Sequence, residues 1–354
     1  MTLPASGNSI ALSQVNTELN LSAIATIGMN DSIVRTLFGV ASGTISMSQG
    51  FGKSSITAQG IWMGGNSVGG SSVTTIDRLL YSTETNAAVS ATLLVARNTM
   101  MALTSKLKAF FLAGTQFDFT IITEIDGYDF QTSTANNPAA VTNTTSYANV
   151  GGINSNTAGY RFASVTTLAV DKFVFSTETF NAAITSVVLA KGYAAMFSAT
   201  SVNKGYAYGG ALPGVKGQTG STSNIQGLDF ASDTVFTVAA TAVTSGMSYF
   251  AYNGGNTGYA ATNLVPGIAI EGFTYSTETA ANTGWVLSAS GIPSSYAQYS
   301  HYGVAKGYTG GGLVAGERSN IITYMQFSNG TNGHLSATLS SPRLGHGATQ
   351  SAYV

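Results

Sequence analysis

The stretch YSTET at residues 81–85 occurs again as FSTET at residues 175–179 and as YSTET at residues 275–279. A catalytic motif is normally needed once, whereas a structural unit that is used several times carries its signature several times. Three copies, each nearly a hundred residues from the next, therefore indicate a repeated structural unit rather than a catalytic site.

Alignment on the aromatic residue that opens this stretch gives six copies, three of them clear and three degraded. The copies open at Tyr81, Phe130, Phe175, Phe230, Tyr275 and Phe327, at intervals of 49, 45, 55, 45 and 52 residues. A threonine follows each aromatic residue after four positions. The copies FQTST at Phe130 and FSNGT at Phe327 depart furthest from the pattern.

Each copy lies within a longer pattern of four short segments. A β-branched and aromatic segment such as IDRLLY precedes the copy, and a glycine-rich aromatic segment such as GIWMGG lies further upstream. A basic residue follows the threonine after 12 positions at Arg97, Lys191 and Arg343, and another alternating segment comes after it. Four strands in about 49 residues, six times over, predict an all-β protein with a six-bladed β-propeller.

The two ends of the repeated region are out of phase within one blade. The segment that would form the first strand of a blade occurs for the last time at the C-terminal end, as HGATQSAYV. The segment that would form the second strand of a blade occurs for the first time near residue 60. We therefore expect residues 345–354 to pair with strands from residues 60–95 and to close the ring, which removes an open sheet edge.

The region before the repeats is different and predicts a small module, residues 1–55, followed by the propeller at 56–354. The segment from Ser13, with apolar residues at Val15, Leu19 and Leu21, predicts a short helix capped by the serine. A second helix is expected to begin at Asn30 and Asp31 and to stop at Gly39. The echo between SIALSQ (9–14) and TISMSQ (44–49) predicts two similar extended pieces that flank the helices.

Two resemblances follow from these motifs. Residues 8–55, with IALSQVNTEL, then VRTL, then ISMSQGFGKSS, resemble a module at the start of tailed-bacteriophage virion proteins. Residues 60–354, most clearly at 76–85, 170–179 and 270–279, resemble kelch-like propeller repeats of phage structural proteins.

The resemblance implies a virion component of the tail, made in the host cytoplasm and associated with a fibre or the baseplate. Residues 1–55 would attach it to other tail or baseplate proteins, and the propeller would face the host. It further implies a homo-oligomer, with a trimer as the form that fibres commonly take.

Composition narrows the set of partners. Only 8% of residues are charged, against roughly 25% in ordinary globular proteins, and the formal net charge is -1. The chain has no basic field of the kind that binds nucleic acid, and it has no cysteine. It also shows no signal peptide and no apolar run of about 20 residues, so we expect neither nucleic-acid binding nor membrane insertion.

The acidic residues decide whether an enzyme should be expected. Ten of the 15 lie in the repeated segments and are expected to form turns or cross-blade hydrogen bonds: Asp77, Glu84, Asp126, Asp129, Asp171, Glu178, Asp229, Asp233, Glu271 and Glu278. Glu18 and Asp31 belong to the N-terminal module, which leaves Asp118, Glu124 and Glu317 as the acids on the ring that could form a glycosidase-type pair.

No cofactor or metal is expected from the remaining motifs. His301, His334 and His346 stand singly, without the spacing of metal ligands. GFGKSS lacks the first glycine of a phosphate-binding loop, because Met47 stands at that position. The sequence therefore predicts a protein that is not an enzyme.

Function on a propeller is expected in loops that differ between blades. The connections between the second and third strands vary most, and they carry Lys216, Glu317 and Arg318 near Tyr208 and Tyr308. These five residues form the predicted receptor-contact surface, which would bind a host surface glycan. The alternative is that the charges only solvate long loops. A non-enzymatic adhesin is the expected function, and an architectural decoration protein or a polysaccharide depolymerase are the alternatives.

Overall fold

The structure is a computed structural model of the chain. It describes residues 3–4, 6, 8–19, 21–51, 56–118, 120–135, 137–138, 151–162, 168–212, 220–245, 248–262, 268–287, 300–302, 305–314 and 316–351. The chain separates into two compact units, Met1–Ala58 and Gln59–Ser351.

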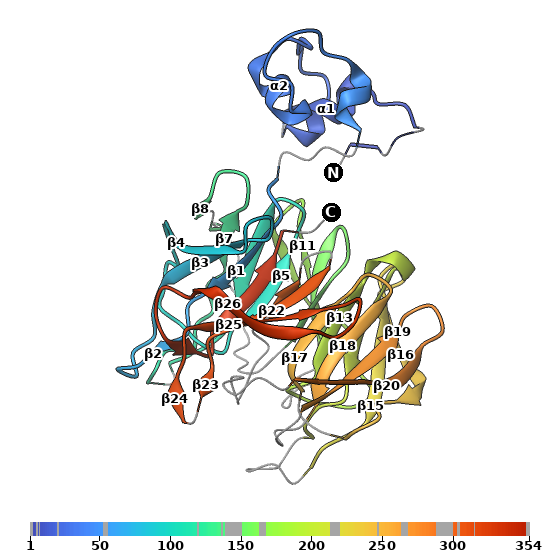
Figure 1. Ribbon diagram of the computed structural model, residues 1–354. Helices are drawn as coiled ribbons and strands as arrows, with labels where there is room; N and C mark the ends of the chain where they lie inside the picture. Colours follow the sequence, from blue (N-terminus) through green and yellow to red (C-terminus); the bar gives the residue numbers. More distant parts are fainter. Residues whose placement is uncertain are drawn as a thin grey trace. The chain divides into compact units, whose positions relative to one another are not determined.

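The second unit is a ring of six antiparallel four-stranded blades (Figure 1). The first blade contains β28 (Gly347–Gln350), β1 (Gln59–Met63), β3 (Thr75–Leu80) and β4 (Thr85–Thr92). The second contains β5 (Met101–Thr104), β6 (Lys108–Leu112), β7 (Asp126–Asp129) and β8 (Thr134–Ala135). The third contains β9 (Gly151–Asn154), β10 (Ala158–Phe162), β11 (Ala169–Val174) and β12 (Thr179–Ser186).

The other three blades follow in chain order. The fourth contains β13 (Ala195–Ala199), the 3-10 turn η2 (Thr200–Val202), β14 (Lys204–Tyr208), β15 (Asn224–Asp229) and β16 (Thr234–Thr241). The fifth contains β17 (Ser248–Asn253), β18 (Thr257–Thr262), β19 (Ile268–Thr274) and β20 (Thr279–Leu287). The sixth contains β21 (Ser300–Tyr302), β22 (Lys306–Gly310), β25 (Ile321–Gln326) and β26 (Asn332–Thr338). Two small pairs join β2 (Asn66–Ser67) to β27 (Arg343–Leu344) and β23 (Leu313–Val314) to β24 (Glu317–Arg318).

The predicted six-bladed propeller is confirmed, including the blades of the two copies that depart furthest from the repeat. The predicted ring closure is also confirmed, because β28 pairs with β1 from Gly60 opposite Gln350 to Met63 opposite Gly347. The backbone N–H of Ser351 then donates to the Gln59 carbonyl at 2.9 Å. Residues 352–354 of the predicted closing strand lie outside the described residues.

Antiparallel pairing gives the ring two chemically different faces. The turn face carries the turns between the third and fourth strands, which have four residues in the first five blades and five in the sixth. The loop face, at the opposite strand ends, carries the connections between the second and third strands and those from each blade to the next. Gln59 opens β1 opposite Leu80, which ends β3, so the chain enters the ring at the turn face.

The first unit contains two short helices, as expected. Helix α1 (Leu12–Glu18) and helix α2 (Ser32–Phe38) are followed by the 3-10 turn η1 (Met47–Gly50). Helix α2 ends at Gly39, which has the left-handed φ of 72° that glycine tolerates. The core of the unit is small and consists of Leu3, Val15, Val34, Leu37 and Phe38.

Two details of the expected module are wrong. The N-cap of α1 is Ala11 and not Ser13, because the Gln14 side chain accepts the Ala11 N–H at 2.7 Å and starts the helix earlier. The echo between residues 9–14 and 44–49 does not mark two extended pieces. It marks two helical starts, since Gln49 accepts the Ser46 N–H at 2.7 Å in the same way.

Candidate functional site

The fourth residue of every YSTET copy lies in the left-handed region of backbone space. The φ values are 51° at Glu84, 57° at Ser133, 52° at Glu178, 54° at Asp233, 51° at Glu278 and 72° at Gly330. A left-handed residue is uncommon outside glycine, asparagine and aspartate, so the position is under a common constraint. The repeated motif is therefore a turn with one defined geometry.

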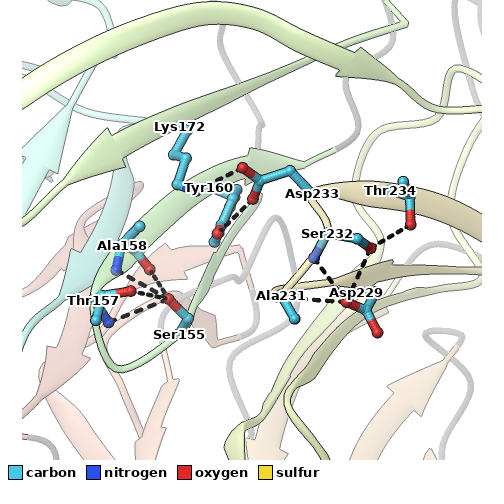
Figure 2. A network of polar contacts seen from close by, with 10 residues as sticks. All are labelled: Ser155, Thr157, Ala158, Tyr160, Lys172, Asp229, Ala231, Ser232, Asp233 and Thr234. Carbon is cyan, nitrogen blue, oxygen red and sulfur yellow. Dashed lines mark hydrogen bonds and ion pairs between the residues drawn. The ribbon is translucent and has the colours of Figure 1, made fainter.

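The acid at this position reaches the preceding blade. Lysine ammonium groups pair with it in four junctions: Lys306 with Glu84 at 2.6 Å, Lys108 with Glu178 at 2.6 Å, Lys172 with Asp233 at 2.6 Å and Lys204 with Glu278 at 2.7 Å. Figure 2 shows one of these junctions, in which Asp233 accepts from both Lys172 and the Tyr160 hydroxyl. The turn acids thus hold neighbouring blades together.

Aromatic stacking also stabilises these junctions between blades. A second-strand ring stacks on the ring that opens the next turn in five pairs: Phe110 on Phe175, Tyr160 on Phe230, Tyr206 on Tyr275, Tyr259 on Phe327 and Tyr308 on Tyr81, with centroids 5.2 to 5.8 Å apart. Burial, together with the neighbouring acid, raises the pKa of Tyr160, Tyr206 and Tyr308, so these hydroxyls stay protonated and donate to the carboxylates.

A second set of buried polar side chains holds the loop-face end of the blades. In the third strand, Asp126, Gln226, Glu271 and Asp77 accept backbone N–H groups from the segment that leaves the preceding blade, at Leu94, Val188, Val243 and Ser340. All four acceptors are buried, and each fixes the path of one connection. The remaining repeated acids also have partners: Asp171 pairs with Arg161, and Asp129 and Asp229 accept N–H groups within their turns.

The repeated basic residues lie at the same end and are fully buried. Arg97 pairs with Asp126, and Arg343 pairs with Asp77, as their fixed position in the repeat suggested. Lys191 stands at the same place, but the fourth blade has Gln226 where the first three blades have aspartate. Its ammonium donates to the carbonyls of Ala207 and Asn224 at 2.9 and 2.7 Å, and burial lowers the pKa of Lys191 to about 7.

The predicted receptor-contact residues do not form one surface. Tyr208 and Tyr308 are only 1% and 3% exposed, so neither ring is available to a ligand. Their hydroxyls donate to Glu271 and Glu84, which explains why a tyrosine is required in the packed junction. Tyr308 moreover belongs to the turn-face junction, at the opposite end of the blade from the loops. Lys216 lies outside the described residues.

Glu317 and Arg318 do lie on the loop face, at the hairpin of β23 and β24. Glu317 is exposed, and the Arg318 guanidinium donates to the Val68 carbonyl of the first blade at 3.0 Å. This bond ties the hairpin of the sixth blade to the neighbouring loop. Figure 1 shows β2, β23 and β24 together at the lower left of the ring.

The loop face exposes apolar side chains that the sequence-based prediction missed. Among the described residues of the propeller, the large hydrophobic side chains that are strongly exposed all lie at this end of the strands: Val68, Leu94, Phe117, Ile121, Leu168, Val188, Val243 and Val286. Hydrophobic residues within turns and loops, such as the phenylalanine of the segment TQFDF, were the signal that could have found them.

Three of these residues, together with the β23–β24 hairpin that is bonded to Val68, define a site that we name the Phe117 patch. It consists of Val68, Gly70, Phe117, Asp118, Ile121, Glu317 and Arg318, from loops of the sixth, first and second blades. The Phe117 ring is 57% exposed and lies over Gly70, where a Cβ atom would come within 3.0 Å of the ring. Glycine at this position, with a φ of 80°, is thus needed for the close approach.

Hydrogen bonds hold the loops of the patch in place. The Asn98 side chain donates to Asn66 Oδ1 at 3.0 Å and to Ser72 Oγ at 3.2 Å, which joins the first blade to the second. The segment around Phe117 is a small hairpin, because Thr115 bridges Ile121 and the Gln116 N–H donates to the Thr120 carbonyl at 2.8 Å. The patch is therefore preformed by the fold.

The acids left over from the repeat gather at this end of the ring. Asp118 and Glu124 lie in the β6–β7 connection and Glu317 in β24, and all three are exposed. The Asp118 Oδ1 atom accepts the Thr120 N–H at 2.9 Å, and this hydrogen bond lowers the pKa of Asp118. The patch therefore carries the Asp118 carboxylate, in the residue that follows an exposed aromatic ring, and the exposed acid Glu317.

Searches for other kinds of site and for relatives found nothing further. Within the described ranges, no group of three or more histidine and acidic side chains could hold a metal ion. Among the helices of the described part of the chain, none is both long and apolar enough to span a bilayer. No family model matches the chain, and no curated protein is significantly similar to it.

Proposed function

We propose that this protein is a tail component of a bacteriophage particle, attached through residues 1–55, and that the loop face of its propeller binds the host surface without cleaving it. The observation that carries the proposal is the difference between the two faces. The turn face is committed to contacts between blades, whereas the loop face presents the exposed apolar side chains and the unrepeated acids.

The sequence resemblance to phage attachment modules and phage kelch-like repeats supports the proposal that the protein is part of a phage tail. The chain enters the ring at the turn face, so the loop face is the end of the propeller away from the point of entry. Loops that differ between blades on a rigid scaffold are the usual place for binding residues. The preformed Phe117 patch has this character.

The first unit supports an attachment role through its surface. Ile24 is 93% exposed at the tip of a turn whose flanking Ala23 and Ala25 carbonyls are both bound by the buried Asn16 amide. Leu12, Leu21 and Ile33 are exposed on the same small unit. We propose that this apolar surface contacts other tail or baseplate proteins, or further copies of this chain in a homo-oligomer.

The test of attachment is sedimentation of the full chain beside the variant Ile24→Asn. Asparagine suits a turn, so the variant is expected to fold. A wild-type oligomer that becomes monomeric in the variant supports contact between copies through this surface. A wild-type monomer removes the homo-oligomer from the proposal.

The test of host binding uses the labelled full chain, a panel of Gram-negative and Gram-positive cells, and polysaccharides purified from the same strains. Sugar release is assayed in the same tubes. A loop-face variant, Val68→Ser with Phe117→Ser and Ile121→Ser, is compared with a turn-face control, Thr83→Ala with Thr177→Ala and Thr277→Ala. All six changed residues lie in turns or loops or at their edges.

Saturable binding by the wild type and the turn-face control, lost in the loop-face variant and without sugar release, is the expected result. Sugar release would replace the adhesin by a depolymerase. Failure to bind any strain would leave an architectural decoration protein as the better account.

A further inference from the structure

The chemistry of the Phe117 patch indicates a class of ligand. We propose that the patch binds glycans that contain amino sugars with a free ammonium group, with one sugar ring stacked on Phe117 and its ammonium beside Asp118. This inference rests on the proposed function, because it names the ligand class of the host-binding face.

The aromatic ring forms a supported platform. One part of the Phe117 ring lies against Gly70, and more than half of the side chain is open to solvent. Aromatic rings pack against the apolar C–H face of other groups, and they attract cations through the negative charge of the ring face. An amino sugar offers both features in one ring.

The carboxylate next to the platform is prepared to bind a cation. An ionised carboxylate has about four acceptor sites, and the N–H of Thr120 uses one of those of Asp118. This hydrogen bond lowers the pKa of Asp118, which favours the ionised form. A charge-assisted hydrogen bond from a ligand ammonium to this carboxylate is stronger than one between neutral groups.

The charge of the patch selects against anionic ligands. Asp118 and Glu317 are both exposed, and the one guanidinium of the patch, that of Arg318, already donates to the Val68 carbonyl. In a chain where 8% of residues are charged, a patch with two exposed acids and one arginine has an excess of formal negative charge. Opposite charge across an interface favours association, and like charge suppresses the wrong partner.

The groups around the platform favour a sugar over a basic peptide. The loops that form the patch also carry hydroxyl and amide side chains that are at least partly exposed: Ser67, Ser71, Thr115, Gln116 and Thr120. Hydroxyl and amide groups both donate and accept, which matches the ring of hydroxyl groups on a sugar. A lysine side chain would use the carboxylate and the aromatic ring but not these groups.

The experiment is calorimetric titration of the full chain with four probes. These are a β-1,4-linked glucosamine tetramer, its N-acetylated form, a galacturonic acid tetramer and tetralysine. The variants Phe117→Ala and Asp118→Asn are compared with matched controls. Val188→Ala removes an exposed apolar side chain elsewhere on the loop face, and Asp229→Asn changes an acid that accepts N–H groups within its own turn, on the turn face.

The glucosamine tetramer is expected to bind the wild type and both controls, and to bind each patch variant about tenfold more weakly. It should also bind more tightly than the acetylated and the acidic tetramers, and added salt should weaken it. Equal binding by wild type and patch variants, or preference for the acidic tetramer, would overturn the proposal. Equal or tighter binding of tetralysine would assign the patch to a basic peptide instead.

The two proposals fail separately. If the full chain binds cells while none of the four probes binds, the ligand class is wrong and the host-binding function stands. If the chain binds neither cells nor probes, both proposals fall.

Discussion

The two faces of the propeller are built from the same strands but use their residues in opposite ways. On the turn face the blades repeat one arrangement, with an aromatic ring and a left-handed residue in all six turns and a hydroxyl pair in five of them. The hydroxyl groups of Thr83 and Thr85 are 2.7 Å apart, and the equivalent pairs in four other blades have the same separation. On the loop face the connections differ in length and in exposed chemistry.

The difference teaches where function can reside in a repeat protein. A residue that recurs in every blade is occupied by contacts that every blade needs, as the paired acids show. Residues outside the repeat, such as Phe117 and Asp118, have no such contact to make and remain open to a ligand. Four measurements test this difference between the two faces.

The largest effect is expected at the buried ion pair that closes the ring. Arg343→Leu leaves the Asp77 carboxylate buried without its charged partner, which should lower the free energy of unfolding by about 3–5 kcal/mol. Urea unfolding of the full chain measures this loss. Arg318→Leu, which removes a guanidinium from the loop-face surface, is the control and should cost less than about 1 kcal/mol. An equal loss of free energy of unfolding in the two variants would contradict the stabilising role of the Arg343–Asp77 pair.

The next effect is a dependence of stability on pH that comes from Lys191. Its pKa is lowered to about 7 in the folded protein, against about 10.4 in an unfolded chain. Between pH 7 and 9 the unfolded chain therefore holds a proton that the native protein has lost, so the free energy of unfolding rises with pH, by about 2–3 kcal/mol.

Chemical unfolding at several pH values checks this rise. Lys191→Met should flatten the curve between pH 7 and 9, because the titrating group is gone. Lys172→Met, at a partly exposed junction of the turn face, is the control and should leave the rise in place. A wild-type curve that falls over this interval would show that the buried ammonium stays protonated.

A smaller loss is expected from the turn acid of the fifth blade. Glu278→Ala removes the acceptor of the buried Tyr206 hydroxyl and of the Lys204 ammonium, which should cost about 1–2 kcal/mol. In this variant, the further change Tyr206→Phe should cost almost nothing, since the hydroxyl has already lost its partner. Glu317→Ala, an exposed acid of the loop face, should change stability by less than about 0.5 kcal/mol and serves as the control.

The smallest effect is expected at an exposed apolar residue of the loop face. Val188→Ser should change the free energy of unfolding by less than about 0.5 kcal/mol, because its side chain makes little contact with the core. The adjacent change Val187→Ser, in a side chain that is 2% exposed, should cost more than about 2 kcal/mol. Thermal unfolding of the two variants compares them. Similar midpoints would mean that Val188 is packed in solution.

The fold was predictable from the sequence because the repeat is structural. All six blades have the same left-handed turn, five junctions have the same stacked aromatic pair, and four blades have a buried acid at the same place in the third strand, so these residues recur at a spacing that can be counted. The closure of the ring could be predicted from the order of the repeated segments. The C-terminal segment has the pattern of a first strand, and the first blade is the one that lacks such a strand at its own start. The ten repeated acids were likewise identified as structural from their recurrence.

The candidate site was predicted only in part, and the errors have physical causes. Tyr208 and Tyr308 were taken for surface residues because their loops are long, but both belong to second strands whose rings pack between blades. Glu317 and Arg318 lie in the connection between the second and third strands, as predicted. Phe117 was missed, because the sequence of a variable segment does not show whether an aromatic side chain in it is buried in a core or exposed to solvent.

The sequence by itself determined the number of blades, the turn chemistry and the closure of the ring, because these depend on local backbone geometry and on contacts that recur in every copy. Only the tertiary structure decided which unrepeated residues meet. Phe117, Gly70 and Arg318 are far apart in the chain, and they come together because the ring joins the sixth blade to the first and the first to the second. The repeat pattern does not predict these contacts, because they occur at one place in the ring.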